Sequence, residues 1–191
     1  MKTRPVFLSL SQLGWSSVFL GFALTPILIV GQATFEEIQN LALEGDASAQ
    51  FTLGAIHDIG QGVPENNTEA AKWYRLSAEQ GNAEAQYNLG VMYDTGEGVP
   101  ENDAEAVRWH HLAAEQGNAE AQYNLGVSYY IGEGVPQDYV HAYAWLGIAL
   151  ASGNEDALEE QLRLEQQMTS SQVTEARGLL TEIHERIQND R

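Results

Sequence analysis

The residue types that most often carry out catalysis are scattered or missing in this chain. It contains no cysteine, which excludes disulfides, thiolate metal sites and a thiol nucleophile. His110 and His111 are neighbours on an expected helix, where side chains diverge by about 100° and cannot share one metal ion unaided. His57, His141 and His184 stand alone in separate segments. We interpret each histidine as a surface or core residue.

Two motifs of serine catalysis also fail in this sequence. Lys72 is the only lysine after residue 33, and Glu69 stands three residues before it, so the Ser-x-x-Lys motif is absent. Residues 126–128 begin like a nucleophile elbow, but Tyr130 occupies the position that needs glycine, and Ser128 lies inside an expected helix. The sequence therefore predicts no catalytic residue, no metal site and no cofactor.

The strongest pattern in the chain is a repeat with a period of 36 residues. Residues 81–91 return as residues 117–127, and a looser copy starts at Gly45. A fixed period of this length is typical of a solenoid, in which neighbouring units cover one another's apolar faces. The sequence predicts three repeats, at residues 45–80, 81–116 and 117–152.

Each repeat has the pattern of two helices joined by a glycine-rich turn. In the second repeat Ala85, Leu89 and Tyr93 follow at spacings of four, which places them on one side of a first helix. Residues 95–100 then contain two glycines and a proline, which end that helix. Gly90 lies within the first helix, where glycine costs about 1 kcal/mol, so we expect close approach of the partner helix backbone there.

The second helix of the pair follows the turn. Asp103 is placed to cap it, and Gly117 ends it. Trp109 has counterparts at the same phase in Trp73 and Trp145, and we interpret all three as core residues between helices.

The two ends of the array differ from its interior, as the ends of solenoids do. Residues 34–44 have the pattern of a lone second helix and are expected to form an N-terminal cap. Residues 153–191 are expected to form a helix pair that acts as a C-terminal cap. Its last helix is predicted to start at a capping box, Thr169–Gln172.

The motif from Ala85 to Pro100, Ala-x-x-x-Leu-Gly-x-x-Tyr-x-x-Gly-x-Gly-Val-Pro, is followed by Ala106-x-x-Trp109 and by residues 113–117. Together these resemble the Sel1-like repeat family, which is related to the tetratricopeptide repeat. The resemblance covers residues 45–152 strongly and is to secreted bacterial members. It implies an all-α fold, a right-handed α/α superhelix of helical hairpins with a C-terminal helical cap. It also implies that the first helices line a concave surface that binds a protein or peptide, and it implies no reaction.

If the first helices line a groove, their positions outside the packing stripe face it. Aromatic residues and polar amides then form two ladders along the groove, and acids flank them. The predicted groove residues are Phe51, Thr52, Ala55, Asp58, Glu84, Tyr87, Asn88, Val91, Asp94, Glu120, Tyr123, Asn124, Val127 and Tyr130. The alternative is that duplication copied these residues and that they serve solubility.

The charge of the chain restricts its partners. Its formal net charge is −18, and none of the three first helices contains Lys or Arg. Nucleic acid is therefore excluded as a partner, and a basic clamp for a carboxylate is disfavoured. We expect a protein or peptide that is neutral or basic and carries apolar anchors.

The N-terminal segment predicts export. Lys2 and Arg4 precede an apolar stretch that ends at Val30, and the small residues Gly31 and Ala33 suit a cleavage site. Residues 1–33 are interpreted as a signal peptide. The alternative is an uncleaved anchor in the inner membrane, with the repeats facing the periplasm and no other contact with the membrane. In a bacterium the destination is the periplasm or the exterior.

The leading hypothesis is a non-catalytic adaptor or scaffold, exported to the cell envelope, that binds a protein or peptide. A hydrolase of the cell envelope with an unrecognised site is the second hypothesis and predicts titratable groups that converge in one pocket. A homo-oligomeric structural module is the third.

Overall fold

The computed structural model describes residues 34–189, which form nine α-helices and the turns between them, with no strand in that range. The predicted leader, residues 1–33, lies outside the described residues. The helices are α1 Phe35–Leu43, α2 Ala47–Ile59, α3 Asn67–Glu79, α4 Ala83–Thr95, α5 Asp103–Glu115, α6 Ala119–Ile131, α7 Tyr139–Ala151, α8 Ala157–Glu165 and α9 Ser170–Asn189. None of these helices is long and apolar enough to cross a membrane.

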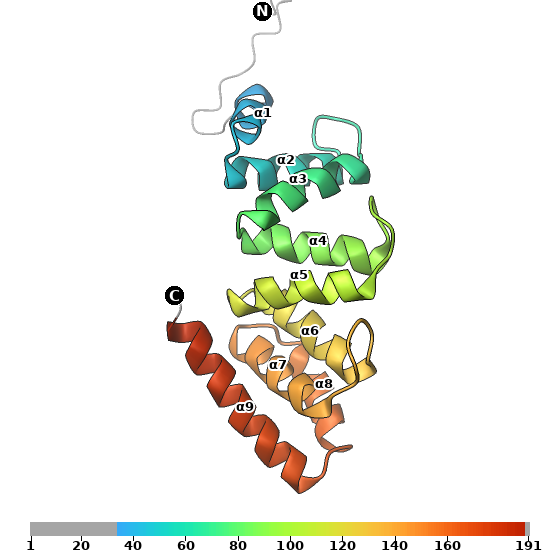
Figure 1. The fold of residues 1–191 in the computed structure, drawn as a ribbon, viewed down its shortest axis with the longest axis vertical. Helices are drawn as coiled ribbons and strands as arrows, with labels where there is room; N and C mark the ends of the chain where they lie inside the picture. The colour runs from blue at the N-terminus through green and yellow to red at the C-terminus, as the bar shows by residue number, and fades with distance from the viewer. Residues whose placement is uncertain (1–33, 190–191) are drawn as a thin grey trace, which may run out of the picture. The chain divides into compact units, whose positions relative to one another are not determined.

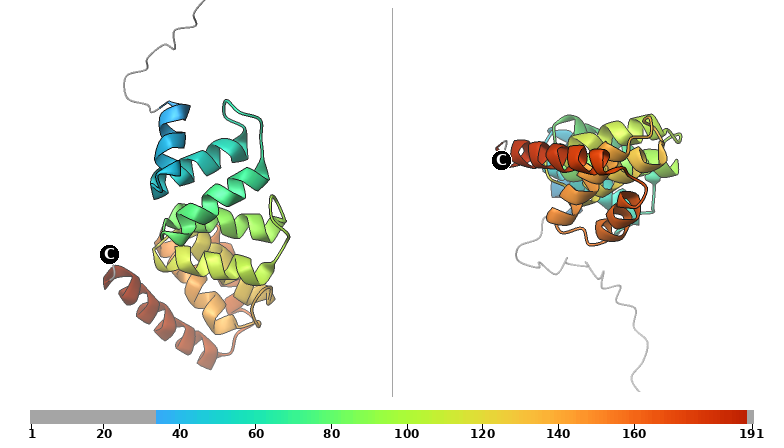
Figure 2. Two further views of the ribbon diagram at one scale, coloured as in Figure 1. Left: turned by 45° about the horizontal axis from the view of Figure 1, so that its top comes forward. Right: turned by 90° about the horizontal axis from the view of Figure 1, so that it is seen from below.

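Successive helices pack against one another from α1 to α7, and α8 and α9 both pack against α7 (Figure 1). The pairs α2–α3, α4–α5 and α6–α7 are the hairpins of the three repeats. Figure 2 shows the same succession from two other directions. The predicted all-α stack of helical hairpins is confirmed.

Polar caps and glycine turns set the helix boundaries in every repeat. The side chain of Asn82 accepts a hydrogen bond from the backbone N–H of Ala85 at 2.9 Å, which satisfies an end group of α4. The cap of α5 is Asn102, so the prediction of Asp103 was wrong by one residue, and Asp103 is the first residue of the helix. Between the two helices the loop crosses α3 so closely at Gly98 that a Cβ there would overlap the carbonyl of Asn67.

The three tryptophans occupy the predicted interior, but to different degrees. Trp109 and Trp145 are 4% and 2% exposed, and each lies in an apolar cluster with the second helix of the preceding repeat and the first helix of its own. Trp73 is only half-buried. Its neighbours are the short α1 and the start of α2, which include Ala42 and Leu53, so less protein surrounds it.

A ladder of buried amides joins each repeat to the unit before it. Gln50, Gln86 and Gln122 donate from Nε2 to the carbonyl eight residues earlier, at 3.1, 3.0 and 3.0 Å. Gln80 and Gln116 donate in turn to Oε1 of the first two glutamines, both at 2.7 Å. Because a buried amide is costly without partners, this ladder fixes how adjacent units stack. Sequence analysis did not find it.

The C-terminal helices cover one side of α7. The predicted capping box is present at the start of α9, where Gln172 accepts from the N–H of Thr169 at 2.9 Å and Thr169 accepts in return. Ile183 and Ile187 of α9 join the same apolar cluster as Ile148 of α7.

Candidate functional site

The predicted groove residues lie on α2, α4 and α6, at equivalent positions one repeat apart. Phe51, Thr52, Ala55 and Asp58 are on α2. The α4 residues are Glu84, Tyr87, Asn88, Val91 and Asp94, and the α6 residues are Glu120, Tyr123, Asn124, Val127 and Tyr130. Glu84, Asp94 and Glu120 are exposed, and the others are half-buried. None of the aromatic side chains is sealed inside the stack.

The aromatic ladder rests on side chains from the second helices. The rings of Phe51 and Tyr74 have centroids 5.9 Å apart, and those of Tyr87 and His110 are 5.8 Å apart. Tyr123 packs against the cluster that contains Leu146. Each aromatic residue therefore has one side buried against the array and another side that can contact a ligand.

The glycines within the first helices make room for these supporting side chains. A Cβ at Gly54 would lie 2.7 Å from the ring of Tyr74, and one at Gly90 would lie 2.6 Å from the ring of His110. The expected close approach is thus made chiefly by inserted side chains, whereas sequence analysis expected the partner backbone. The glycine is needed because no larger residue leaves space for the inserted ring.

Two of the predicted acids bond to the supporting residues. The hydroxyl of Tyr74 donates to Asp58 at 3.2 Å. His110 is fully buried, and its Nε2 lies 2.8 Å from Asp94 Oδ2 and 3.5 Å from Asn124 Nδ2. Of the two interpretations of His110, the structure shows the core residue. Asp94 and Asn124 therefore stand between a buried ring and the surface.

The structure brings Asp94, Asn124 and Val127 together at the wall of a hollow of about 270 Å³ between α4 and α6. The other residues around it are Glu101, Asp103, Ser128, Ile131 and Glu133. Four of the eight lining residues carry a carboxylate, and none is Lys or Arg. Sequence analysis missed Glu101, Asp103 and Glu133 because they lie in loops or at a helix start, which it treated only as helix boundaries. The repeated Gly-x-Gly turn was the available signal, since it folds back beside the first helix.

Carboxylates lie close enough to two tyrosines of the aromatic ladder to raise the pKa of their hydroxyls. Burial raises the pKa of the Tyr87 hydroxyl, and Glu120, Glu84 and Asp94 raise it further. Burial and the α8 side carboxylates, Glu160 first, likewise raise the pKa of Tyr123. Anions that disfavour a tyrosinate favour a cation at the same place.

The remaining predicted residues are partly occupied by contacts within the chain. The hydroxyl of Tyr130 accepts from Gln167 at 2.7 Å, and Glu120 accepts from Asn154 at 2.9 Å. Thr52 bonds to the carbonyl of Ser48 in its own helix at 2.8 Å. Asp94 and Asn124 also contact His110, so most polar groups of the predicted surface already have one partner within the chain.

The titratable residues that the structure describes are dispersed among separate contacts. Among residues 34–189 no group of three or more His, Asp or Glu side chains is placed to hold a metal ion. His141 lies 2.8 Å from Asp138 and stacks on Tyr129, while His111 packs edge-on against Trp145. Ser128, in the acidic hollow, donates to the carbonyl of Asn124 in its own helix.

Comparison with protein families identifies the repeats. The model of the Sel1 repeat matches residues 47–82, 83–118 and 119–154. These matches keep the 36-residue period and start two residues after the predicted boundaries. No curated protein matches the chain significantly.

Two solved structures of bacterial proteins match this chain with about a third of the aligned residues identical. A protective antigen of uropathogenic Escherichia coli strains, described as displaying an SLR fold, is 35% identical with a TM-score of 0.74, over 81% of this chain and 33% of that one. A Sel1 repeat protein from Oxalobacter formigenes is 35% identical with a TM-score of 0.62, over 66% of this chain and 53% of that one.

A third structure shows the fold alone. Helicobacter pylori cysteine rich protein B is 18% identical with a TM-score of 0.51, over 68% of this chain and 98% of that one. The chain spans about a third of the E. coli antigen and about half of the Oxalobacter protein.

Three matched repeats cover more than half of the sequence, and they agree with the hairpins of the structure. The chain belongs to the Sel1 repeat family.

Proposed function

We propose that this protein is a non-catalytic adaptor that holds a partner protein or peptide on the surface formed by α2, α4 and α6. Sel1 repeats generally mediate contacts between proteins, which supports the general class. The observation that carries the specific proposal is the acidic hollow beside a half-buried aromatic ladder. It combines apolar contact area with a place for a positive charge.

The partner segment is neutral or basic and carries apolar or aromatic anchors. Tyr87 and Tyr123 provide ring faces for those anchors, and Asn88 and Asn124 provide amides for the partner backbone. A lysine or arginine of the segment enters the hollow between Asp94 and Glu133. Nucleic acid is not a partner, because its phosphates are repelled by this surface.

The adaptor works in the cell envelope after export by residues 1–33. The charged start, apolar run and small residues of that segment support this part of the proposal. The mass of the protein isolated from its native cells tests it, because cleavage after Ala33 shortens the chain at the N-terminus. An intact N-terminus in the membrane fraction would indicate the anchored form, and an intact N-terminus in the cytosol would contradict export.

Crosslinking in the native compartment, followed by mass spectrometry, tests the binding surface. We expect the partner set of the full chain to be lost when Tyr87→Ala and Tyr123→Ala are combined. The matched control combines Leu158→Ala and Leu162→Ala, which truncate two exposed leucines of α8. An unchanged partner set in the tyrosine variant would remove this surface from consideration.

A second experiment tests the charge of the partner. Glu101→Gln and Glu133→Gln remove two carboxylates of the hollow without touching the pair of Asp94 and His110. We expect weaker binding of the crosslinked partner and a shallower dependence of its affinity on salt. Equal affinity and equal salt dependence would show that the partner does not place a cation there.

A further inference from the structure

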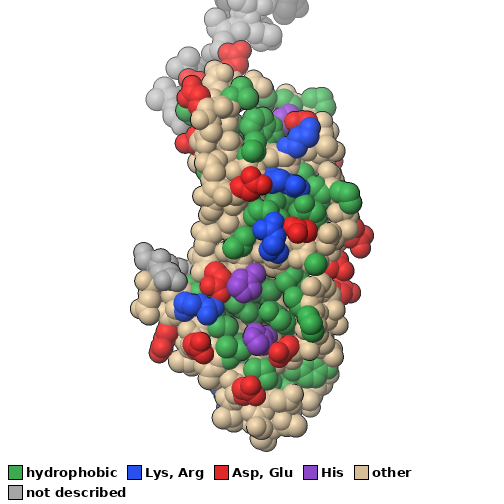
Figure 3. All heavy atoms as spheres, in the orientation of Figure 1, with side chains coloured by type: hydrophobic (Ala, Val, Ile, Leu, Met, Phe, Trp, Pro, Cys, Tyr) green, Lys and Arg blue, Asp and Glu red, His purple; other side chains and the backbone are tan. Residues whose placement is uncertain are grey.

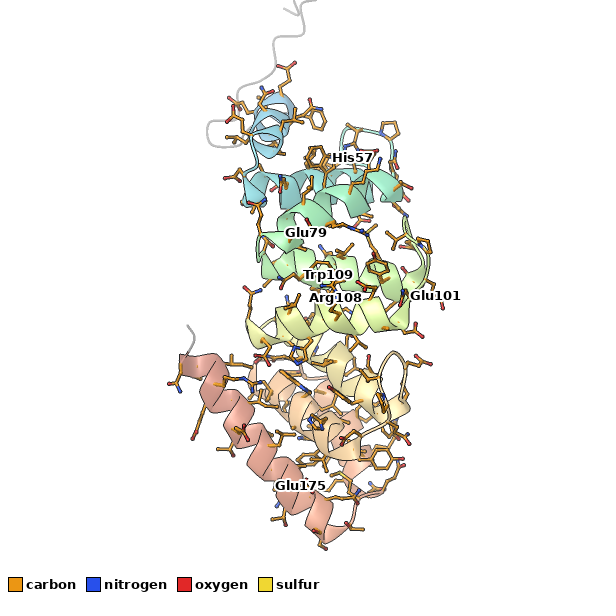
Figure 4. All side chains as sticks on the ribbon, viewed as in Figure 1. His57, Glu79, Glu101, Arg108, Trp109 and Glu175 are labelled. Atoms are coloured by element: carbon orange, nitrogen blue, oxygen red, sulfur yellow. The ribbon has the colours of Figure 1, made fainter. Side chains whose placement is uncertain are left out.

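The Lys and Arg side chains of the repeats lie on the second helices, whereas the proposed groove is formed by the first helices and contains none. Residues 45–152 contain only three Lys or Arg residues, and these are Lys72, Arg75 and Arg108. All three come from the second helices α3 and α5. Figure 3 shows Lys and Arg side chains among hydrophobic ones along the face turned to the viewer, and Figure 4 shows Arg108 beside Trp109 on α5.

Two leucines accompany these cations at equivalent positions. Leu76 of α3 is 44% exposed and Leu112 of α5 is 40% exposed. We call the surface made of Lys72, Arg75, Leu76, Arg108 and Leu112 the α3–α5 face. It includes a mostly apolar hollow of about 440 Å³. The lining residues of that hollow are Thr68, Ala71, Lys72, Arg75, Leu76, Gly98 and Val99.

The third repeat shows what covers the same positions. The counterparts of the α3–α5 face on α7 are Ala144, Gly147 and Ile148, and α9 lies on them. Leu180 of α9 lies so close over Gly147 that a Cβ there would overlap it. Ile148 is 1% exposed, in one cluster with Ile183. We call the row of apolar residues at these equivalent positions, Leu76, Leu112 and Ile148, the ridge. An amphipathic helix is the kind of element that covers this ridge on α7.

The flanking residues determine which helix each ridge accepts. On α7 they are small, so the apolar side of α9 reaches the backbone. On α3 and α5 they are Lys72, Arg75, Arg108 and His111, which would stand beside the apolar stripe of a docked helix. We propose that the α3–α5 face docks an amphipathic helix of a partner protein, whose apolar stripe covers Leu76 and Leu112 and whose flanking carboxylates meet the three cations.

Each cation already has a partner within the chain, and Arg108 also lies 4.0 Å from the centroid of the Trp109 ring. Lys72 pairs with Glu69 at 2.5 Å, and Arg108 pairs with Glu105 at 3.0 Å, each with a neighbour three residues earlier on an exposed helix. Such pairs are weak and exchange readily. Arg75 bonds to the hydroxyl of Tyr93 at 2.6 Å and makes no ion pair within residues 34–189.

Charge argues against a second copy of this chain as the occupant. Two α3–α5 faces brought together would place cations against cations. The covered and uncovered ridges are also continuous, because Arg186 near the end of α9 bonds to Glu115 at the end of α5. This surface and the proposed groove are separate, so one array can hold two different partners.

A display library tests the proposal on the full chain. Its members are 20-residue helices that keep the apolar positions of α9 and vary the flanking positions among Glu, Lys, Gln and Ser. We expect selection to enrich Glu at those positions, and the affinity of a selected peptide to fall at least tenfold when Leu76→Glu and Leu112→Glu are combined. A second variant, Lys72→Glu with Arg108→Glu, changes only exposed cations and is expected to weaken binding similarly.

The matched control combines Leu158→Glu and Leu162→Glu, which add the same charge at exposed leucines of α8. This control and the groove variant with Tyr87→Ala and Tyr123→Ala are expected to bind the selected peptide within twofold of the original chain. The proposal would be overturned if the full chain enriched no peptide relative to the chain with Leu76→Glu and Leu112→Glu. It would also be overturned if selection enriched Lys at the flanking positions. Self-association in sedimentation that the two leucine substitutions abolish would overturn it as well, because the occupant would then be a second copy.

Discussion

The second helices of the repeats all present an apolar ridge on the outside of the stack, but α9 covers this ridge only on α7. Ile148 of α7 is buried there, whereas its counterparts Leu76 and Leu112 are exposed. The residues beside the ridge also differ, because they are Ala144 and Gly147 on α7 but Lys72 and Arg75 on α3. Near-identical repeats thus differ in what they can bind through a few side chains, while their shared glycines, asparagines and glutamines keep the stack the same.

The largest contrast is expected at the tryptophans. Trp145→Ala removes a side chain that is 2% exposed, and we expect the free energy of unfolding to fall by about 3–5 kcal/mol. Trp73→Ala removes a half-buried ring beside α1, so its loss is expected to be clearly smaller. Urea unfolding followed by circular dichroism measures both. Equal losses would show that the covered and uncovered ends of the array are equally well packed around the indole.

The ridge itself can be compared at one position. Ile148→Ala opens a cavity under α9 and is expected to cost about 2–5 kcal/mol, while Leu112→Ala acts at the surface and costs less than about 1 kcal/mol. The same unfolding measurement applies. A large loss for Leu112→Ala in the isolated chain would mean that the α3–α5 face is already covered.

Two glycine substitutions compare a helix position that faces an inserted side chain with one that faces open space. Gly90→Ala places a methyl group 2.6 Å from the His110 ring, and we expect a loss of about 1–3 kcal/mol. Gly178→Ala in α9 meets no atom within 4 Å, so higher helix propensity is expected to add about 0.5–1 kcal/mol. Thermal unfolding of both variants gives the signs. Stabilisation by Gly90→Ala would contradict the inserted ring.

The third repeat also lacks a bond that the first two have. Ser152 stands where Gln80 and Gln116 donate to the amide ladder, and Oε1 of Gln122 is buried without a partner among the described residues. Ser152→Gln is expected to supply that bond and to raise the free energy of unfolding by about 1 kcal/mol. Ser152→Met, of similar length but without an N–H donor, is the control. Equal stability of the two variants would contradict the explanation.

Alkaline pH distinguishes the first repeat from the third. Burial, and then Asp58, raise the pKa of Tyr74, whereas its counterpart Leu146 cannot ionise. An unfolded tyrosine ionises near pH 10, so the stability that Tyr74 provides below that pH is lost as the pH rises, by about 0.8 kcal/mol at pH 10.5. Between pH 8 and pH 10.5 we expect the free energy of unfolding of the Tyr74→Phe variant to fall by about 0.8 kcal/mol less than that of the original chain. An unchanged loss would show that Tyr74 ionises as easily in the fold.

Much of the fold could be predicted because the repeated residues are types that each have one usual structural role. Glycines and prolines at fixed spacing end helices, and alanines, leucines and tryptophans at helical spacing mark the buried sides. The degree of burial of Trp73 could not be predicted, because it depends on the length of α1 and on what lies beyond it. The cap at Asn102 was missed by one residue because Asn and Asp are both good caps.

The candidate site was predicted less completely. The helix pattern places Tyr87, Asn88 and Tyr123 on α4 and α6, but whether a partner uses them remains a prediction. The contacts of His110 and of the other inserted rings could not be predicted from a single sequence. They join the second helix of a repeat to its first helix through residues that are 16 positions apart. The outer ridge was missed because Leu76 and Leu112 look like ordinary core leucines until the neighbouring helix is known to be absent there.

The amide ladder gives the array a direction. Each first-helix glutamine depends on the carbonyl of the unit before it, and α1 supplies that carbonyl to Gln50 of the first repeat. A whole repeat can therefore be removed or inserted without leaving a buried amide unpaired, provided that α1 stays ahead of the first repeat and that α8 and α9 still follow the last one.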